Sequence, residues 1–320
     1  MADGHIVRSL DVVPLDDPEL EASVSEIRGD MRDAAKAREL VDGADVLVHA
    51  AAALPIRGSR SLIMEVNVGG TRTLLDAARE RGVGRVLFIS STSVYGVPEV
   101  HPIPEDAPLV GVGAYGESKI AAEALVRGSG LPWVIIRPKT FIGPERLGVF
   151  EILFDWIREG RRIYVLGDGS NRYQLLAVED LVEAIVRAGE RDVAGDVFNV
   201  GATDFGTVRS DLETLIAHAG TRARLRPIPA RPAEIALRGL ELARVSPLVE
   251  WHYKTASRDS YVDVSKAQRL LGWDATKSNA ETLVENYDWY AANRETLDAA
   301  GVTHRVPWNQ QALRFLKKVS

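Results

Sequence analysis

The chain has 320 residues, of which 46% are hydrophobic and 26% charged, and its formal net charge at pH 7 is −6. This length allows one large core or two unequal domains, and the negative charge argues against a general nucleic-acid binder. There is no cysteine, which excludes disulfides and thiolate chemistry, and the scattered histidines predict no metal site. No apolar run approaches the ~20 residues that cross a bilayer, and no signal pattern opens the chain. We therefore expect a cytoplasmic protein without membrane contacts.

The first half of the chain alternates between short apolar strands and helices. Strands are predicted at 6–13, 45–52, 84–90 and 131–138, and helices at 33–43, 62–82 and 115–130. The strands after the first are continuous apolar runs instead of alternating ones. That pattern is typical of a parallel sheet covered by helices on both faces, so the sequence predicts an α/β fold.

The pattern loosens after about residue 144. Helices are predicted at 150–160, 178–190, 210–220, 265–273 and 279–295, and strands at 162–167 and 196–201. We interpret 1–144 as one domain and 145–320 mainly as a smaller mixed α/β domain, interleaved with the last sheet strands near 178–201. Residues 309–319 form a predicted basic amphipathic helix, for which docking on the body is favoured over a membrane or partner contact.

Three residues form the strongest chemical constellation. Ser91 follows an apolar strand, where a parallel sheet presents its carboxyl ends to ligands. Tyr115 and Lys119 are four residues apart at a helix start, so their side chains share one face. A tyrosine has a pKa of about 10, and a nearby cation is expected to lower it. A serine hydroxyl can bind the same substrate oxygen, so we predict that Tyr115 is a catalytic base assisted by Ser91 and Lys119.

Several segments resemble one enzyme family in its order along the chain. They are GDMRD (29–33), DVLVHAAA (45–52), EVNVGGTRTLLDAA (65–78), ISSTSVYG (89–96), AYGESKIAAE (114–123), IIRPKTFIGP (135–144), LGDGSNRYQLLAVEDL (166–181), FNVG (198–201) and SKAQRLLGW (265–273). The chain resembles the extended short-chain dehydrogenases/reductases, in their nucleotide-sugar epimerase/dehydratase branch. This resemblance implies a Rossmann-like doubly wound sheet, an NAD cofactor, a nucleotide-sugar substrate and a homodimer.

The resemblance also assigns binding roles. Asp11 would bind the adenosine ribose, which favours NAD over NADP, and Asp30 would lie by the adenine. The full set of residues expected at the cofactor is Asp11, Asp30, Met31, His49, Ala50, Ala51, Asn67, Tyr115 and Lys119. The residues expected at the substrate are Ser91, Thr92, Thr140, Arg172 and Arg258, with the two arginines on the diphosphate.

Two departures from the family pattern narrow the reaction. In the 4,6-dehydratases of this branch, Asp and Glu follow the catalytic Ser or Thr and expel water from the sugar. Here Thr92 and Ser93 follow Ser91, so dehydration is disfavoured, as is the decarboxylating subgroup with its glutamate at this place. Thr140 stands where the family usually has asparagine, and an unusual Lys139 precedes it.

The beginning of the sequence departs further. The family pattern opens with a strand, a GxxGxxG turn and a helix, whereas this sequence opens near the end of such a helix, at ADGH (2–5). GVGAYG (111–116) fits G-x-G-x-x-G but follows a Pro-rich loop instead of a strand, so we do not interpret it as a phosphate-binding loop. The first strand-turn-helix is therefore predicted to be missing, with an empty place of roughly 9–10 Å in the sheet. Either Met1 is an internal methionine of a longer product, which we favour, or the chain is truncated with impaired NAD binding.

The leading hypothesis is NAD-dependent epimerisation of a nucleotide sugar by transient oxidation. One alternative is a reductase of 3β-hydroxysteroid or flavonoid type, which the arginines and the GDGSNRY segment (167–173) disfavour because an apolar substrate needs no phosphate contacts. The other alternative is a truncated, non-catalytic member of the family.

Overall fold

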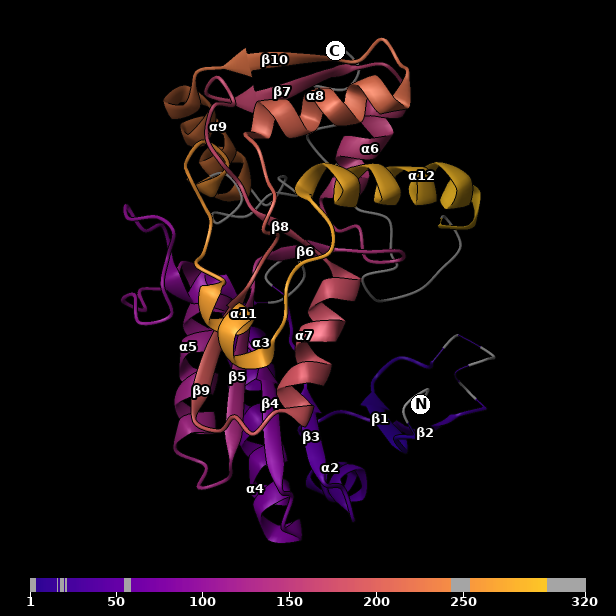
Figure 1. Ribbon diagram of the computed structural model, residues 1–320, viewed down its shortest axis with the longest axis vertical. Helices are drawn as coiled ribbons and strands as arrows, with labels where there is room; N and C mark the ends of the chain where they lie inside the picture. Colours follow the sequence, from indigo (N-terminus) through magenta and orange to yellow (C-terminus); the bar gives the residue numbers. More distant parts are fainter. Residues whose placement is uncertain are drawn as a thin grey trace.

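A computed structural model describes residues 4–15, 17, 20, 22–54, 59–242 and 254–297 of the chain (Figure 1). Its centre is a parallel sheet in the order β3-β4-β5-β9, formed by β3 (Val46–His49), β4 (Arg85–Ile89), β5 (Trp133–Pro138) and β9 (Asp196–Val200). These strands are the apolar runs of the sequence, and nearly every residue of β4 and β5 is buried. The predicted α/β fold with a Rossmann-like parallel sheet is confirmed.

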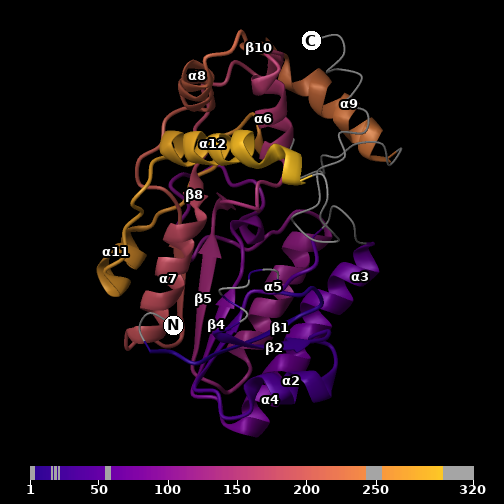
Figure 2. The same cartoon turned by 90° about the vertical axis from the view of Figure 1, so that its right-hand side faces the viewer.

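Helices cover both faces of this sheet (Figure 2). On one face, α4 (Thr71–Arg81) and α5 (Gly113–Arg127) enclose a core that includes Val86 and Phe88 of β4. On the other face, α7 (Val178–Glu190) and α11 (Ser265–Leu271) enclose a second core, which includes Leu87 of β4. Neighbouring residues of β4 thus point into opposite cores, which explains why the strand reads as a continuous apolar run.

The strands β1 (Val7–Asp11) and β2 (Val24–Arg28) form a separate two-stranded parallel sheet beside the helix α2 (Ala34–Val41). Neither pairs with β3, which is the edge strand of the central sheet. Val46 and Val48 on β3 are 40% and 46% exposed, whereas Leu47 and His49 are buried, so only one face of this edge strand is covered. β1 and β3, the strands that the sequence predicts on either side of the empty place, therefore do not pair with each other.

The predicted helix over 62–82 is present as three continuous pieces. They are α3 (Arg60–Met64), the π-helical segment η1 (Glu65–Gly70) and α4. A π-helical turn widens the backbone spiral by one residue, and such turns occur frequently at functional sites. Asn67 lies within it, buried. The helix ends at Gly82, which adopts a positive φ of 70° and closes the last turn, as its glycine predicts.

The second half of the chain builds a further layer beyond the carboxyl ends of the central strands (Figure 1). Its elements are β6 (Thr140–Ile142), α6 (Phe150–Arg158), β7 (Arg162–Leu166), β8 (Leu175–Ala177), α8 (Val208–Ala219), β10 (Arg224–Ile228), α9 (Ala230–Leu242) and α12 (Asn279–Leu297). The strands pair in parallel as β6-β8 and β7-β10. A third core, with Phe154, Trp156 and Tyr287, joins α6 to α12. The predicted helix at 309–319 lies outside the described residues.

Within the described ranges, no helix combines the length and hydrophobicity of a membrane span, and no group of acidic and histidine side chains has the arrangement of a metal site.

Candidate functional site

Ser91 and Tyr115 meet at the carboxyl end of β4. Ser91 lies two residues after the end of β4 and caps the short 3-10 helix η2 (Thr92–Tyr95), since its Oγ accepts from the backbone N of Ser93 at 3.1 Å. Tyr115 lies in the first turn of α5, and Ser91 is the hydroxyl side chain that lowers the pKa of its phenol. The close approach of α5 depends on Gly116, where a Cβ would lie 2.9 Å from the carbonyl oxygen of Ser93. A glycine beside the tyrosine therefore brings the two hydroxyls together.

The electrostatic surroundings of Tyr115 differ from the prediction. Burial raises the pKa of its phenol, while the positive charge of Arg146 and the Ser91 side chain lower it. The Arg146 guanidinium stacks 3.7 Å from the ring centroid of Phe141 and donates to the carbonyl oxygen of that residue at 3.0 Å. Arg146 follows Glu145, whose φ of 61° marks a tight turn after β6. Sequence reasoning missed Arg146, because only this turn brings it towards α5.

Lys119 is fully buried one helical turn after Tyr115. Its Nζ donates to the backbone oxygen of Ile89 at 2.8 Å and lies 5.9 Å from the centroid of the Tyr115 ring. Burial lowers the pKa of Lys119 to about 8, and the Glu123 carboxylate opposes that shift. The lysine is thus on the predicted face of the helix, but Arg146 and Ser91, rather than Lys119, are the groups that lower the pKa of Tyr115 here.

A buried ion pair lies behind these residues. Arg137 at the end of β5 donates to both carboxylate oxygens of Glu123, at 2.9 and 2.7 Å, and both side chains are at most 1% exposed. Glu123 also accepts from Ser90 Oγ at 2.6 Å, and Arg137 Nη1 donates to the Tyr95 hydroxyl at 2.7 Å. The network joins α5 to β4, β5 and η2, and so fixes the relative positions of the elements that carry Tyr115 and Ser91.

A chain of hydrogen bonds runs from His49, the last residue of β3, through η1 and the start of α4 to α5. Thr71 Oγ1 donates to the carbonyl of Asn67 at 2.6 Å, so it accepts from Nε2 of the buried His49 at 2.8 Å. His49 Nδ1 has no hydrogen-bond partner among the described residues. Burial and the charge of Lys119 lower the pKa of His49 to about 3, so the ring is neutral. Asn67 binds both backbone groups of Ala53 and the Ser118 hydroxyl, and its place at the cofactor stays a prediction.

Asp11 and Asp30 lie together at the carboxyl ends of β1 and β2, where Gly29 N donates to Asp11 O at 3.0 Å. The exposed Asp11 carboxylate accepts from Val13 N at 2.9 Å. Asp30 receives both Nε and Nη2 of Arg32, which lowers the pKa of its carboxyl.

Met31 points into the core rather than to this edge. A Cβ at Gly70 would lie 2.7 Å from its Cε, so only the absence of that carbon lets the two segments pack. A cofactor role for the Met31 backbone stays a prediction. Ala50 and Ala51 follow β3 at an edge open to solvent, where small side chains leave room for a ligand.

The predicted substrate residues come from three segments. Thr140 at the start of β6 shares a hydrogen bond of 2.8 Å with the hydroxyl of Tyr173. Arg172 is exposed, and its guanidinium lies 4.4 and 4.9 Å from the ring centroids of Phe205 and Tyr261. The segment of the exposed Arg258 is attached to the same place, because Asn171 Nδ2 donates to the Arg258 carbonyl at 3.0 Å.

Thr92 is also buried, at 6% exposed, in η2 beside Ser91.

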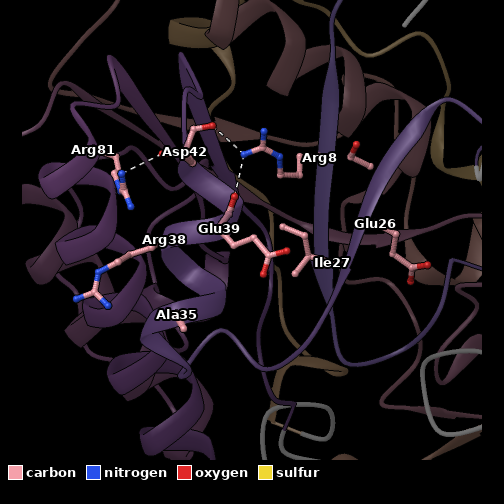
Figure 3. A pocket seen from close by; sticks show the side chains of 9 residues that line it. Arg8, Glu26, Ile27, Ala35, Arg38, Glu39, Asp42 and Arg81 are labelled. Carbon is pink, nitrogen blue, oxygen red and sulfur yellow. Dashed lines mark hydrogen bonds and ion pairs between the residues drawn. The ribbon is translucent and has the colours of Figure 1, made fainter.

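A hollow between α2 and the small sheet is a separate feature (Figure 3). Its charged side chains are engaged locally: Arg8 Nη1 donates to the carbonyls of Glu39 and Asp42, both at 2.8 Å, and Arg81 pairs with Asp42 at 3.1 Å. Arg38 at its border pairs with Glu80 at 2.8 Å. None of the predicted catalytic residues lines it. We interpret these contacts as the attachment of β1 to the end of α2.

The central parallel sheet has a serine, a tyrosine and a buried lysine at its carboxyl edge. An acid ends β1, and another follows β2 by two residues. These features define a dinucleotide-dependent α/β enzyme. The profile of the NAD dependent epimerase/dehydratase family matches residues 3–201. The chain belongs to this family, and its cofactor is NAD.

Relatives along the whole chain agree with this assignment. An uncharacterised protein of Sinorhizobium fredii, y4nG, is 35% identical over 98% of this chain and 80% of its own length. A UDP-glucose 4-epimerase of Mycolicibacterium smegmatis is 29% identical over 91% of this chain and 92% of its own. A dTDP-glucose 4,6-dehydratase of Streptomyces niveus is 29% identical, covering 84% and 76%.

Solved structures share the fold. MoeE5 in complex with UDP-glucose and NAD has a TM-score of 0.73 at 26% identity, with 93% of both chains covered. The UDP-glucose 4-epimerase of Thermotoga maritima with UDP-glucose has a TM-score of 0.74 at 23% identity, also covering 93% of both.

The residues present fit NAD chemically. The exposed Asp11 carboxylate can accept from ribose hydroxyls, the small residues after β3 permit close approach, and Tyr115 and Lys119 lie at the edge where a nicotinamide would bind. Among the described residues, GVGAYG (111–116) lies at the start of α5 and follows a loop instead of a strand, as its place in the sequence predicts.

Proposed function

We propose that the protein epimerises a nucleotide-diphosphate sugar through transient oxidation and re-reduction of one ring carbon. The observation that carries the proposal is the place of Tyr115 at the start of α5, beside Ser91 at the carboxyl end of β4. The ammonium of the buried Lys119 lies 5.9 Å from the ring centroid of Tyr115, and the Arg146 guanidinium lowers the pKa of the phenol. This arrangement suits removal of a proton from an alcohol.

In this mechanism, NAD supplies the acceptor and donor of the two hydrogen transfers. Ser91 Oγ holds the sugar hydroxyl by a hydrogen bond, and the deprotonated Tyr115 accepts its proton. Arg146 stabilises the phenolate, because its guanidinium favours the negative charge. Lys119 keeps the end of β4 in place through Ile89 O and adds positive charge. When the ring carbon is reduced again from its other face, Tyr115 returns the proton to the sugar oxygen.

Epimerisation is favoured over dehydration because Thr92 and Ser93 follow Ser91 in η2, so no acid is present at these places to expel water. The substrate proposal is supported by Arg172 and Arg258, which lie on joined segments near Thr140 and suit a diphosphate. The names of the relatives, which include UDP-glucose 4-epimerases, point the same way. We further propose 1–144 as the NAD-binding part and 145–320 as mainly the substrate-binding part. The homodimer and the cytoplasmic location stay predictions.

The test is turnover of purified protein with NAD on a panel of UDP- and dTDP-sugars, with the products separated by chromatography. The proposal predicts an epimer of at least one sugar, with no release of water. A dehydrated keto-sugar would show that the family's other reaction is catalysed. Activity on an apolar ketone alone would favour the reductase alternative, and no activity together with no NAD-induced thermal shift would favour the non-catalytic one.

A further inference from the structure

Lys139 is a buried lysine that the proposed reaction does not use. It lies between β5 and β6, directly after Pro138, where its backbone N donates to Val200 O at 2.9 Å, and its side chain is only 2% exposed. The Nζ donates to Ser260 Oγ at 2.7 Å and lies 4.7 Å from the ring centroid of Tyr173. No carboxylate in the described part of the chain forms an ion pair with it, and burial lowers its pKa to about 7.

Both groups that Lys139 contacts belong to the segments that carry the substrate arginines. Ser260 N donates to Arg172 O at 2.8 Å, and Gln174 N donates to Ser260 O at 3.1 Å, so the two segments run together. Arg172 N also donates to Asp259 Oδ1 at 2.8 Å. Residues 171–174 and 258–260 therefore form one unit, and Lys139 is a direct side-chain link between that unit and β5.

This unit holds the backbone of Arg172, while the guanidinium also donates to the carbonyl oxygen of Phe205, outside the unit, at 3.3 Å. The backbone of Arg172 is fixed by Ser260 and Asp259, and its guanidinium is packed against the rings of Phe205 and Tyr261. Tyr173 in the same unit binds the Thr140 hydroxyl, one residue after Lys139. A shift of the unit away from β5 would therefore move Arg172 relative to Thr140 and the catalytic edge.

Burying an ammonium without a carboxylate partner is costly, and an apolar side chain of similar length would fill the same space without that cost. The position of Lys139 is thus better explained by what its ammonium holds than by core packing. We propose that Lys139 is a positioning residue that attaches the Arg172 and Arg258 segments to the end of β5, and so places Arg172 for contact with the substrate diphosphate. The last clause rests on the proposed function.

Two variants remove this link from opposite sides. Lys139→Met keeps the length of the side chain but not the ammonium, and Ser260→Ala removes the acceptor. The matched control is Lys266→Met: Lys266 also lies over a ring, 5.1 Å from the Phe198 centroid, and donates to Asp196 at 2.7 Å, but it joins α11 to β9. The position of Arg172 is read from its Nε–Hε signal in NMR spectra, which the faces of two aromatic rings shift. Affinity for UDP and dTDP is measured by calorimetry.

In both variants we expect the Arg172 signal to move toward that of freely exposed arginines. We expect UDP or dTDP to bind about tenfold more weakly, as for a lost charge-assisted hydrogen bond, while kcat at saturating substrate stays within about threefold. Lys266→Met should change neither. An unmoved Arg172 signal in folded variants would overturn the positioning role, and so would a moved signal with unchanged nucleotide affinity. Wild-type protein that binds neither UDP nor dTDP would instead contradict the proposed function. The two failures can be told apart, because the Arg172 signal reports on the role of Lys139 without any nucleotide.

Discussion

The two sets of strands that bear predicted site residues are built differently. β4 and β5 are paired on both sides, buried in two cores and joined to α5 by the Glu123–Arg137 network. β1 and β2 pair only with each other, and Ile27 is the one residue of these two strands that is fully buried. The residues of the proposed reaction thus lie at the rigid edge formed by β4 and β5. The residues of the proposed adenosine contacts lie at the small, exposed edge formed by β1 and β2. We infer that the fold itself fixes the positions of the catalytic residues. The positions of the residues at the ends of β1 and β2 depend more on the bound cofactor.

Tyr115→Phe should have the largest effect at the rigid edge. Loss of the phenolic base is expected to lower kcat by about 10²–10⁴-fold, the usual contribution of a general base, while NAD still binds. Turnover and NAD titration of the same sample check this. Tyr164→Phe on β7 is the control and should stay active. Activity within a few fold of wild type would remove Tyr115 from the mechanism.

Glu123→Gln tests whether the network makes that edge rigid. Breaking one side of a buried ion pair leaves Arg137 uncompensated, so the free energy of unfolding should fall by about 3–5 kcal/mol. Urea denaturation measures the change. The control is Asp76→Asn, which breaks the exposed pair with Arg79 and should cost no more than about 1 kcal/mol. Equal losses of unfolding free energy in the two variants would mean that the buried network stabilises the fold no more than an exposed ion pair does.

Arg146→Gln addresses the electrostatics of the same edge. The guanidinium lowers the pKa of Tyr115, so its removal should raise that pKa. Because the active base is the deprotonated form, kcat rises with pH through this pKa, and the acid limb of the pH–rate profile should move to higher pH. Arg146→Lys keeps the charge and should move it less. A limb that stays in place in Arg146→Gln would show that the guanidinium does not act on the phenol.

Asp11→Asn probes the exposed edge and should have the smallest effect. Weakened hydrogen bonds to ribose hydroxyls should raise the Kd for NAD by about 3- to 10-fold, with kcat at saturation unchanged. Fluorescence titration with NAD measures it, with Asp42→Asn, near the end of α2 and paired with Arg81, as the control. A large fall in kcat, or no change in Kd, would mean that the acid at the end of β1 has another role.

The same contrast explains what sequence alone could predict. The fully buried strands and the helix of Tyr115 were predicted because their continuous apolar runs and glycine stops are local signals. β2 was missed because VSEIR is short and largely exposed, and β6 and β8 because each has three residues. Arg146 and Lys139 act through contacts across the chain, which no local pattern records. The expected effect of Lys119 on the pKa of Tyr115 stays a prediction. The four-residue spacing places both residues on one helix face, but the ammonium donates to Ile89 O, and Arg146 and Ser91 are the groups that lower the pKa of Tyr115 in this structure.

The most direct test follows a label through the reaction. A nucleotide sugar that the protein epimerises is prepared with deuterium on the inverting carbon and converted with NAD in ordinary water. The account predicts that the epimer keeps its deuterium, because the hydrogen leaves and returns to the same carbon within one site. Deuterium lost to water would contradict oxidation and re-reduction and would point to proton exchange instead.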